Sequence, residues 1–170
     1  MTDQNLATDR AIETAWRIHG ELGNWTAKVD AKASFALTLD SAATAGIIAL
    51  STDDHVLAHL HGWGARTLLW SGTALILVSG VFAMLVVVPR LRGRKAKAEA
   101  ASNFIYFGHL QHRRADELAT ALKTTDILPV LSRQLIVTSK IAWAKHRHIQ
   151  TSFITFGIGA ALVFFAGLTR

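Results

Sequence analysis

Apolar residues gather in three blocks of the chain, and the middle block, residues 68–88, is the clearest of them. Its sequence, LLWSGTALILVSGVFAMLVVV, contains no charged residue. A helix of about 20 apolar residues crosses the hydrocarbon core of a bilayer, which is about 30 Å thick. Trp70 lies near the start of the block, where an aromatic side chain anchors a helix at the membrane interface. The pattern therefore predicts a membrane-spanning helix.

The first apolar block, residues 33–50, is interrupted by Asp40 and by several Ser and Thr residues. Taken alone, it would also fit a buried helix of a soluble protein. Because only a short loop joins it to the middle block, we expect an antiparallel helical hairpin that crosses the membrane twice over residues 33–88.

The last apolar block is short, but Ser152 and Thr169 extend it to residues 152–169. Arg147 and Arg170 flank the block, and long basic side chains in such positions reach the two opposite headgroup layers. The final segment, residues 151–170, therefore predicts a third membrane helix.

The segment before the first span, residues 1–32, predicts an amphipathic helix. We allow a bend at Gly20 and Gly23, because glycine weakens a helix. The positions expected on its inner face follow a helical spacing, and they are Ile12, Ala15, Trp16, His19, Leu22, Thr26 and Val29.

The segment between the second and third spans, residues 89–150, predicts two further helices outside the membrane. Their apolar positions are Phe104, Phe107, Gln111, Ala115, Leu118 and Leu122 for the first, and Leu128, Leu131, Leu135 and Ala142 for the second, which begins near Pro129. Such faces are not left in water, so we expect them to pack on the N-terminal helix. The sequence thus predicts an all-α membrane protein, a single domain over residues 1–170, with three membrane helices and a cytoplasmic helical bundle made from the N-terminal helix and the 98–148 region.

The charges orient these spans. The chain carries a net charge of +6, and five of its cations crowd the exit of the second span: Arg90, Arg92, Arg94, Lys95 and Lys97. The loop of residues 51–65 contains Asp53 and Asp54 and no Lys or Arg. Short loops rich in Lys and Arg stay in the cytoplasm, so we expect a multi-pass protein with a cytoplasmic N-terminus. Because this topology accounts for the cations, nucleic-acid binding is not expected.

The sequence offers no motif for catalysis. It contains no Gly-rich phosphate loop, nucleophile elbow, zinc-protease motif or cysteine, so we expect no enzyme and no resident cofactor. His55, His59 and His61 are metal-binding residue types. They lie with two aspartates in a loop that also holds Gly62 and Gly64, and a solvated outer loop is the favoured interpretation rather than a metal site.

Asp40 stands out because ionisable groups at membrane depth are often functional. Two interpretations have equal weight. Asp40 lines a polar pore between subunits, or it is protonated or hydrogen-bonded to Thr38, Ser41 or Thr44 within a helix contact. The small residues beside it let membrane helices approach closely and predict a seam between oligomer subunits: Ala42, Ala43, Ala45 and Gly46.

Three cations recur every seven residues in the segment before the last span: Arg133, Lys140 and Arg147. This spacing places them on one stripe of a helix. The stripe either meets phosphate, on lipid headgroups or on a nucleotide, or it is a solvated face.

Two stretches go beyond a generic membrane sequence: NWTAKVDAKASFALTLDSA, which begins at Asn24, and SNFIYFGHLQHRRADEL, which begins at Ser102. In order and spacing they resemble the Pycsar effector membrane family, which has a D-x-K-A-x segment at the mouth of its first span and an N-x-x-Y-F-G-H-like segment after a basic exit. The matching positions here are Asp30, Lys32, Ala33 and Ser34, then Asn103, Tyr106, Phe107, Gly108 and His109.

The resemblance implies a function in antiphage defence in a bacterial inner membrane. In such a system a pyrimidine cyclase makes cyclic CMP or cyclic UMP on infection, and the effector, as a homo-oligomer, impairs the membrane and causes abortive infection. The residues that would then hold the nucleotide, if the N-terminal helix packs on the second motif, are Trp25, Lys28, Asp30, Lys32, Asn103, Tyr106, Phe107 and His109. An alternative role for Asp30 and Lys32 is to pair with the second motif and hold the bundle together.

Two other functions fit the same pattern of spans. One is a small channel or transporter subunit that is not gated by a nucleotide, which Asp40 and the outer histidines favour. The other is a passive membrane anchor that recruits a partner through its cytoplasmic face.

Overall fold

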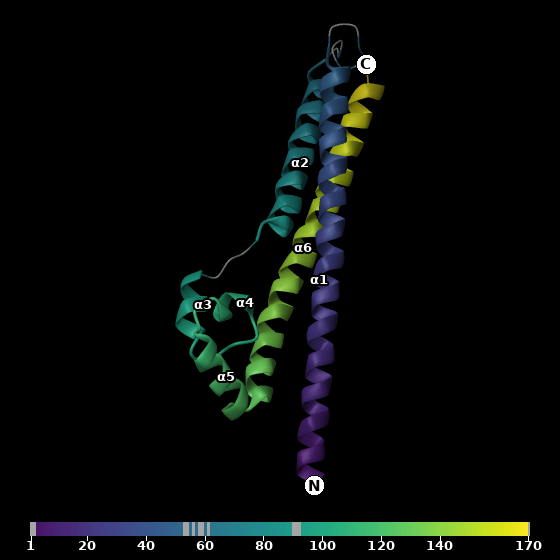
Figure 1. The fold of residues 1–170 in the computed structure, drawn as a ribbon. Helices are drawn as coiled ribbons and strands as arrows, with labels where there is room; N and C mark the ends of the chain where they lie inside the picture. The colour runs from purple at the N-terminus through teal and green to yellow at the C-terminus, as the bar shows by residue number, and fades with distance from the viewer. Residues whose placement is uncertain are drawn as a thin grey trace. The chain divides into compact units, whose positions relative to one another are not determined.

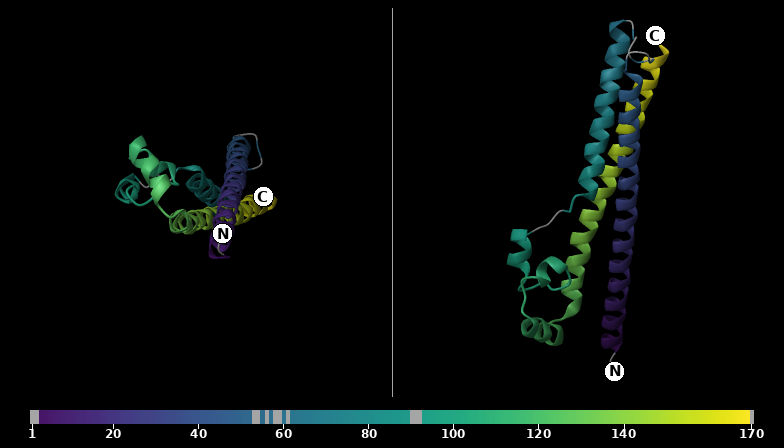
Figure 2. Two further views of the ribbon diagram at one scale, coloured as in Figure 1. Left: turned by 60° about the horizontal axis from the view of Figure 1, so that its bottom comes forward. Right: turned by 45° about the horizontal axis from the view of Figure 1, so that its top comes forward.

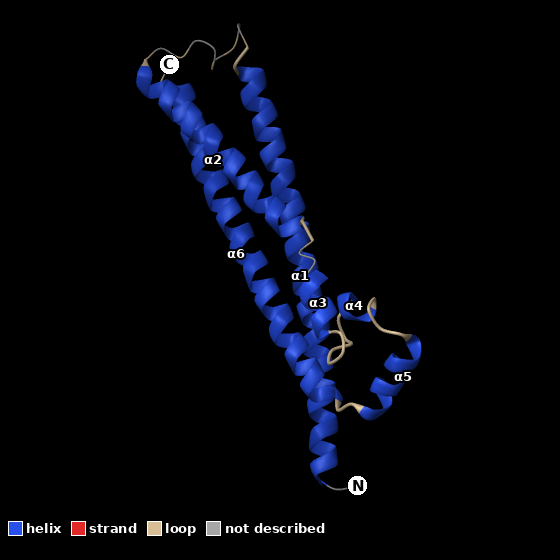
Figure 3. Cartoon of the chain, turned by 90° about the vertical axis from the view of Figure 1, so that its left-hand side faces the viewer, coloured by secondary structure: helices blue, strands red, loops and turns tan. Residues whose placement is uncertain are grey.

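The computed structural model describes residues 3–52, 55, 57, 60, 62–89 and 93–169. Six helices make up this part of the chain: α1 (Asp3–Leu50), α2 (Trp63–Val87), α3 (Gly93–Glu99), α4 (Phe107–Leu110), α5 (Ala115–Thr124) and α6 (Ile127–Leu168) (Figure 1). Figure 3 shows helices and loops, with no strand among the described residues. The predicted all-α fold is confirmed.

Contacts divide the chain into two compact units. One comprises Met1–Thr26 and Pro89–Trp143 and is called the pocket unit; the other comprises Ala27–Val88 and Ala144–Arg170 and is called the membrane unit. Helices α1 and α6 each contribute to both units.

The predicted spans are the apolar parts of three long helices. By length and composition α1, α2 and α6 are each able to cross a membrane. The predicted span 33–50 is the C-terminal end of α1, and the predicted span 68–88 coincides with most of α2. The third predicted span, residues 152–169, continues without a break from the helix expected to begin near Pro129, because α6 is helical from Ile127 to Leu168.

In the membrane unit, α2 and α6 meet along a seam of small residues. The ribbons of the long helices are drawn from two further sides in Figure 2. Ala65, Gly72 and Ser79 of α2 lie opposite Ala166, Gly159 and Ser152 of α6, and all six are buried. Both sets repeat every seven residues. A Cβ added to Gly72 would lie 2.7 Å from the carbonyl oxygen of Gly159, and a Cβ on Gly159 would lie 2.7 Å from the carbonyl oxygen of Gly72. The two glycines therefore permit a backbone approach that a larger residue would block.

Helix α1 completes the membrane unit with its own row of small residues. Val29, Ala33 and Ala36 are buried in a cluster with Ala83 and Val86 of α2 and Ile149 of α6. Apolar side chains of this size give a close three-helix contact.

The loop between α1 and α2 is more than a solvated connection. Leu57 and Leu60 are buried, at 7% and 3% exposure, against Ala65 of α2 and Ala166 of α6. The burial of these two leucines could not be predicted from the sequence, because they lie in a loop rich in Asp, His and Gly residues and belong to no long apolar run. Asp53, Asp54, His59 and His61 lie outside the described residues, as do Arg90, Arg92, Arg170 and the side chains of Arg94 and Lys95.

In the pocket unit, α1 buries the predicted stripe with one exception. Ala15 and Leu22 are buried and Ile12, His19 and Thr26 are half-buried, as predicted, whereas Trp16 is 44% exposed. The helix continues through Gly20 and Gly23, so neither glycine ends it. A helix packed on neighbours tolerates the roughly 1 kcal/mol that glycine costs against alanine.

The single helix predicted over Phe104 to Leu122 is wrong. The structure has a short α4, a turn, and then α5. Arg113 stabilises this break, because its Nε and Nη2 donate hydrogen bonds to the carbonyl oxygens of Ala100 and Ala101, at 2.6 and 2.5 Å. Its guanidinium also lies over the ring of Phe104, 5.7 Å from the ring centre. Helix α5 then begins afresh, with the Glu117 carboxylate accepting a hydrogen bond from the backbone N–H of Arg114.

Candidate ligand pocket and intramembrane polar cluster

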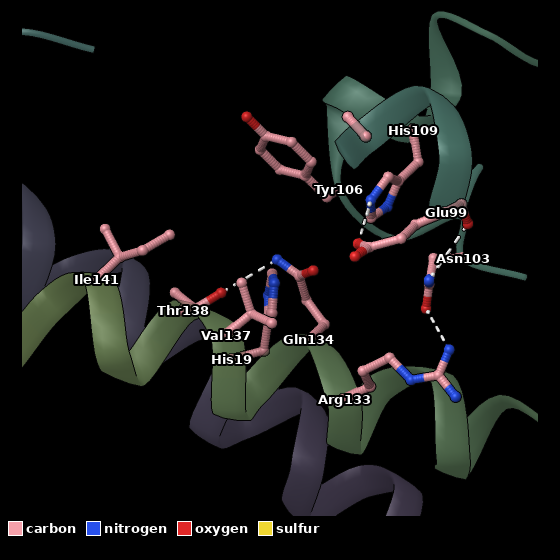
Figure 4. A pocket seen from close by; sticks show the side chains of 11 residues that line it. His19, Glu99, Asn103, Tyr106, His109, Arg133, Gln134, Val137, Thr138 and Ile141 are labelled. Carbon is pink, nitrogen blue, oxygen red and sulfur yellow. Dashed lines mark hydrogen bonds and ion pairs between the residues drawn. The ribbon is translucent and has the colours of Figure 1, made fainter. Parts of the chain in front are cut away.

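The pocket unit encloses a cavity of about 220 Å³. Its walls come from three parts of the unit (Figure 4): His19 from α1, a group around α3 and α4, and successive turns of α6. The lining residues are His19, Ala96, Glu99, Asn103, Tyr106, His109, Arg133, Gln134, Val137, Thr138 and Ile141. Three of the eight residues predicted for a ligand site are among them: Asn103, Tyr106 and His109.

Asn103 joins two walls of the pocket. It is buried, and its Nδ2 donates to the carbonyl oxygen of Glu99 at 3.2 Å, which satisfies a backbone acceptor at the end of α3. Its Oδ1 accepts a hydrogen bond from Nη1 of Arg133 on α6 at 3.4 Å. This bond holds the guanidinium at the pocket wall, and the remaining N–H groups of Arg133 have no partner among the described residues. Arg133 therefore has donors left for an anion.

Tyr106 and His109 form the aromatic side of the pocket. Their ring centres are 5.3 Å apart in an edge-on arrangement, and Nε2 of His109 lies 3.6 Å from a carboxylate oxygen of Glu99. The Tyr106 ring covers Gly108 so closely that a Cβ at Gly108 would collide with it. The absence of a side chain at Gly108 is what allows the ring to fold back toward the pocket.

The other predicted ligand residues do not line this cavity. Phe107 is 64% exposed and Trp25 is 48% exposed. Lys28, Asp30 and Lys32 belong to the membrane unit, whereas the second motif belongs to the pocket unit.

Asp30 has a partner that the sequence did not suggest. Its Oδ1 accepts a hydrogen bond from Nζ of Lys145 on α6 at 2.5 Å, and the lysine side chain is 15% exposed. The ion pair ties the start of the apolar part of α1 to α6. This contact is the helix-holding role foreseen for Asp30, with α6 rather than the second motif as its partner.

The stripe of three cations is divided by the structure. Arg133 lines the pocket, whereas Lys140 and Arg147 are exposed on α6 and do not. Only the first of the three is therefore placed to meet a ligand in this cavity.

Asp40 is the centre of a polar cluster inside the membrane unit. Its side chain is 6% exposed, and Oδ2 accepts a hydrogen bond from Oγ of Ser79 on α2 at 3.3 Å. Ser79 also lies 2.9 Å from the carbonyl oxygen and 3.0 Å from the hydroxyl oxygen of Ser152 on α6. Three membrane helices thus share one network of hydrogen bonds.

The partner of Asp40 differs from the three that were predicted. Thr44 donates to the backbone carbonyl oxygen of Asp40 at 2.8 Å rather than to the carboxylate, and Thr38 donates to the carbonyl oxygen of Ser34. Threonine in a helix reaches the carbonyl one turn back more readily than a neighbouring carboxylate. The second carboxylate oxygen, Oδ1, is buried and has no hydrogen-bond partner among the described residues.

No cluster of metal-binding side chains is present within the described ranges. Of the three histidines considered for a metal site, only His55 lies in those ranges.

Sequence reasoning missed several pocket residues. Glu99, His19 and Gln134 carry no local motif, and they converge only because three separate segments fold together. Apart from the second motif, the one sequence signal that pointed to this pocket was Arg133, which lies on the same helical stripe as Lys140 and Arg147. A contact between that stripe and Asn103 could not be derived from spacing.

A sequence model of the family described as Pycsar effector protein domain matches residues 14–169, nearly the whole chain. Searches among curated proteins and among solved structures find no match.

Proposed function

Because the chain belongs to the Pycsar effector protein domain family, an antiphage defence family, we propose that it is a membrane effector activated by a cyclic pyrimidine nucleotide. Cyclic CMP or cyclic UMP, made by a partner pyrimidine cyclase, binds the pocket, and the membrane helices of a homo-oligomer then impair the bacterial inner membrane. The cell dies by abortive infection. The protein acts without catalysis, with its N-terminus and pocket unit in the cytoplasm.

The pocket is the observation that carries this proposal. A cyclic nucleotide presents one phosphate charge, a sugar and a base, and these require a cation, hydrogen-bonding groups and an aromatic surface. Arg133 offers the cation, Tyr106 the aromatic ring, and Gln134 an amide that can address a base edge. The second sequence motif, on which the family resemblance rests, thus contributes Asn103, Tyr106 and His109 to a cavity whose side chains suit a cyclic nucleotide.

The size of the cavity favours a small ligand. Ligand pockets commonly measure about 300–1,000 Å³, and this one measures about 220 Å³.

Activation by the messenger is a shift between two states of the protein. A ligand changes such an equilibrium only if it binds one state more tightly than the other. Helices α1 and α6 carry pocket residues in one unit and polar-cluster residues in the other: His19 and Asp40 on α1, and Arg133 and Ser152 on α6. A nucleotide that favours one arrangement of these helices at the pocket therefore biases the membrane unit too.

The test is infection of bacteria that express the chain with or without a pyrimidine cyclase, while membrane potential is followed. We expect the potential to collapse during infection only when both are present. A collapse without the cyclase would favour a channel that no nucleotide gates, and an unchanged potential in both strains would favour a passive anchor.

A further inference from the structure

Lys28 and Lys32 are the last cations of α1 before its apolar part, since no Lys or Arg follows them up to Leu50. They belong to the membrane unit and do not line the pocket described above. Both lysines are exposed, and neither ammonium group has a carboxylate or another hydrogen-bond partner among the described residues. Two cations of the first sequence motif are thus available to a ligand outside the pocket.

Helix α6 brings a third cation to the same end of the membrane unit. Ile149 of α6 is buried in one cluster with Ala33 of α1, so the residues beside them lie at a similar depth. Arg147, two residues before Ile149, is exposed, and its guanidinium has no partner within the described ranges. Asp30, three residues before Ala33, is already paired with Lys145. This end of the unit therefore carries uncompensated positive charge and is called here the basic end: Lys28, Lys32 and Arg147.

Large apolar side chains adjoin the basic end on its membrane side. Lys28, Lys32 and Phe35 are four and three residues apart, so they follow one stripe of α1. Phe35 is 59% exposed at the end of this stripe. On α6, Ile154 follows Arg147 by seven residues, which places it on the same helical face, and it is 54% exposed. On both helices an outward-facing cation is thus followed, toward the membrane, by an outward-facing apolar side chain.

An anionic phospholipid matches this pattern, because it joins a phosphate in the headgroup layer to acyl chains in the layer beneath. Cations beside a membrane helix attract anionic lipids. A lysine stem packs along apolar surface while its ammonium group stays in the headgroup layer. A soluble nucleotide would supply a phosphate, but it has no acyl chain to cover Phe35. The pairing of charge with exposed hydrocarbon therefore favours a lipid as the ligand.

We propose that Lys28 and Lys32 bind the phosphate of an anionic phospholipid whose acyl chain lies on Phe35, and that Arg147 contacts headgroups at the same end of the unit. The first sequence motif is then a lipid-binding segment at the mouth of the first span, whereas the second motif contributes to the nucleotide pocket. The inference uses the membrane unit alone, so it holds whether or not a nucleotide activates the protein.

Fluorescence quenching by labelled lipids tests this site, because the chain contains no cysteine and a single one can carry a fluorophore. The label is attached to full-length Ala31→Cys, an exposed position three residues from Lys28. The protein is reconstituted in phosphatidylcholine vesicles that contain a small amount of nitroxide-labelled phosphatidylglycerol or, separately, nitroxide-labelled phosphatidylcholine. We expect the anionic lipid to be enriched about fivefold or more at the label, which is the effect of at least one cation at a membrane surface.

Matched substitutions separate the site from the overall charge. Lys28→Gln with Lys32→Gln should reduce the enrichment at least about threefold, whereas Lys28→Arg with Lys32→Arg keeps the charge and should retain it. Arg10→Gln with Lys123→Gln removes the same charge from exposed positions of the pocket unit and should also retain it. A label at Leu85→Cys of α2, 41% exposed and next to a member of the same buried cluster, should not respond to the lysine substitutions.

Equal quenching by the two lipids at Ala31→Cys would overturn the proposal, as would an enrichment that survives the two glutamine substitutions at Lys28 and Lys32. An equal loss with Arg10→Gln and Lys123→Gln, or at the label on Leu85→Cys, would show attraction by the net charge of the protein and would overturn it as well. The experiment contains no nucleotide, so its failure leaves the proposed function standing.

Discussion

Ser79 of α2 and Ser152 of α6 bury their hydroxyl oxygens 3.0 Å apart, and both side chains are fully buried. One further bond from Ser79 reaches Asp40 of α1. Two unremarkable serines thus connect an intramembrane carboxylate to both other membrane helices. Neither serine stands out in the sequence, because serine is common in membrane helices and only its partner makes it informative.

Replacing Ser79→Ala removes the hydrogen bonds to Asp40 and Ser152 at once. We expect the free energy of unfolding to fall by about 0.6–1.7 kcal/mol, the average and the maximum found for interhelical hydrogen bonds in a membrane protein. Ser71→Ala is the matched control on the same helix, because Ser71 is exposed and bonds to the carbonyl oxygen of Thr67. Unfolding in detergent, followed by circular dichroism, measures both. Equal effects of the two substitutions would contradict the role assigned to the cluster.

The α2–α6 seam makes Gly159 intolerant of even one methyl group. Gly159→Ala should destabilise the protein by about 1–3 kcal/mol, because the new Cβ meets the backbone carbonyl of Gly72 and backbone atoms cannot move aside easily. Gly157→Ala, two residues away on the same helix, has open space and should be neutral or slightly stabilising, since alanine favours helix. Thermal unfolding in detergent distinguishes the two. If Gly159→Ala did not destabilise the protein, the backbones of α2 and α6 would not approach each other as closely as described.

Arg133 should dominate the affinity of the pocket for a cyclic nucleotide. A hydrogen bond to a charged group contributes about 1.5–3 kcal/mol, so Arg133→Gln should weaken binding about 10- to 100-fold. Lys140→Gln removes the same charge from an exposed site outside the pocket and should leave the affinity within about twofold. Calorimetric titration of the purified full chain with cyclic CMP and cyclic UMP gives both values. Equal losses would indicate general attraction by positive charge rather than a pocket.

A substitution at Asp30 distinguishes a role in helix packing from a role in ligand binding. Asp30→Asn weakens the ion pair with Lys145 and should lower stability by less than about 1 kcal/mol, because the aspartate is 41% exposed. Nucleotide affinity should stay unchanged, since Asp30 does not line the cavity. The same titration and unfolding experiments measure both quantities. A loss of affinity without a loss of stability would return Asp30 to the ligand site.

The features that depend on a local pattern of residues could be predicted from the sequence. Long apolar runs identify spans whatever surrounds them, so the three membrane helices and the buried stripe of Ala15, Leu22 and Val29 were predictable. Contacts between segments distant in the chain were not. The break at Arg113 is stabilised by hydrogen bonds to the carbonyl groups of Ala100 and Ala101, and the partner of Asp40 is 39 residues away in the sequence. The pocket contains residues of both kinds. Its motif residues Asn103, Tyr106 and His109 were predicted as ligand residues from the sequence, whereas His19 and Glu99 come to the pocket only because distant segments pack together.

Release of a dye from liposomes that contain the purified chain tests the central claim most directly. Addition of cyclic CMP or cyclic UMP should release the dye from vesicles with the unaltered protein, whereas cyclic AMP should not, and Arg133→Gln should require about 10- to 100-fold more nucleotide, in step with its weaker binding. Vesicles that retain their dye at saturating concentrations of both pyrimidine nucleotides, or that leak equally with none, would contradict the account.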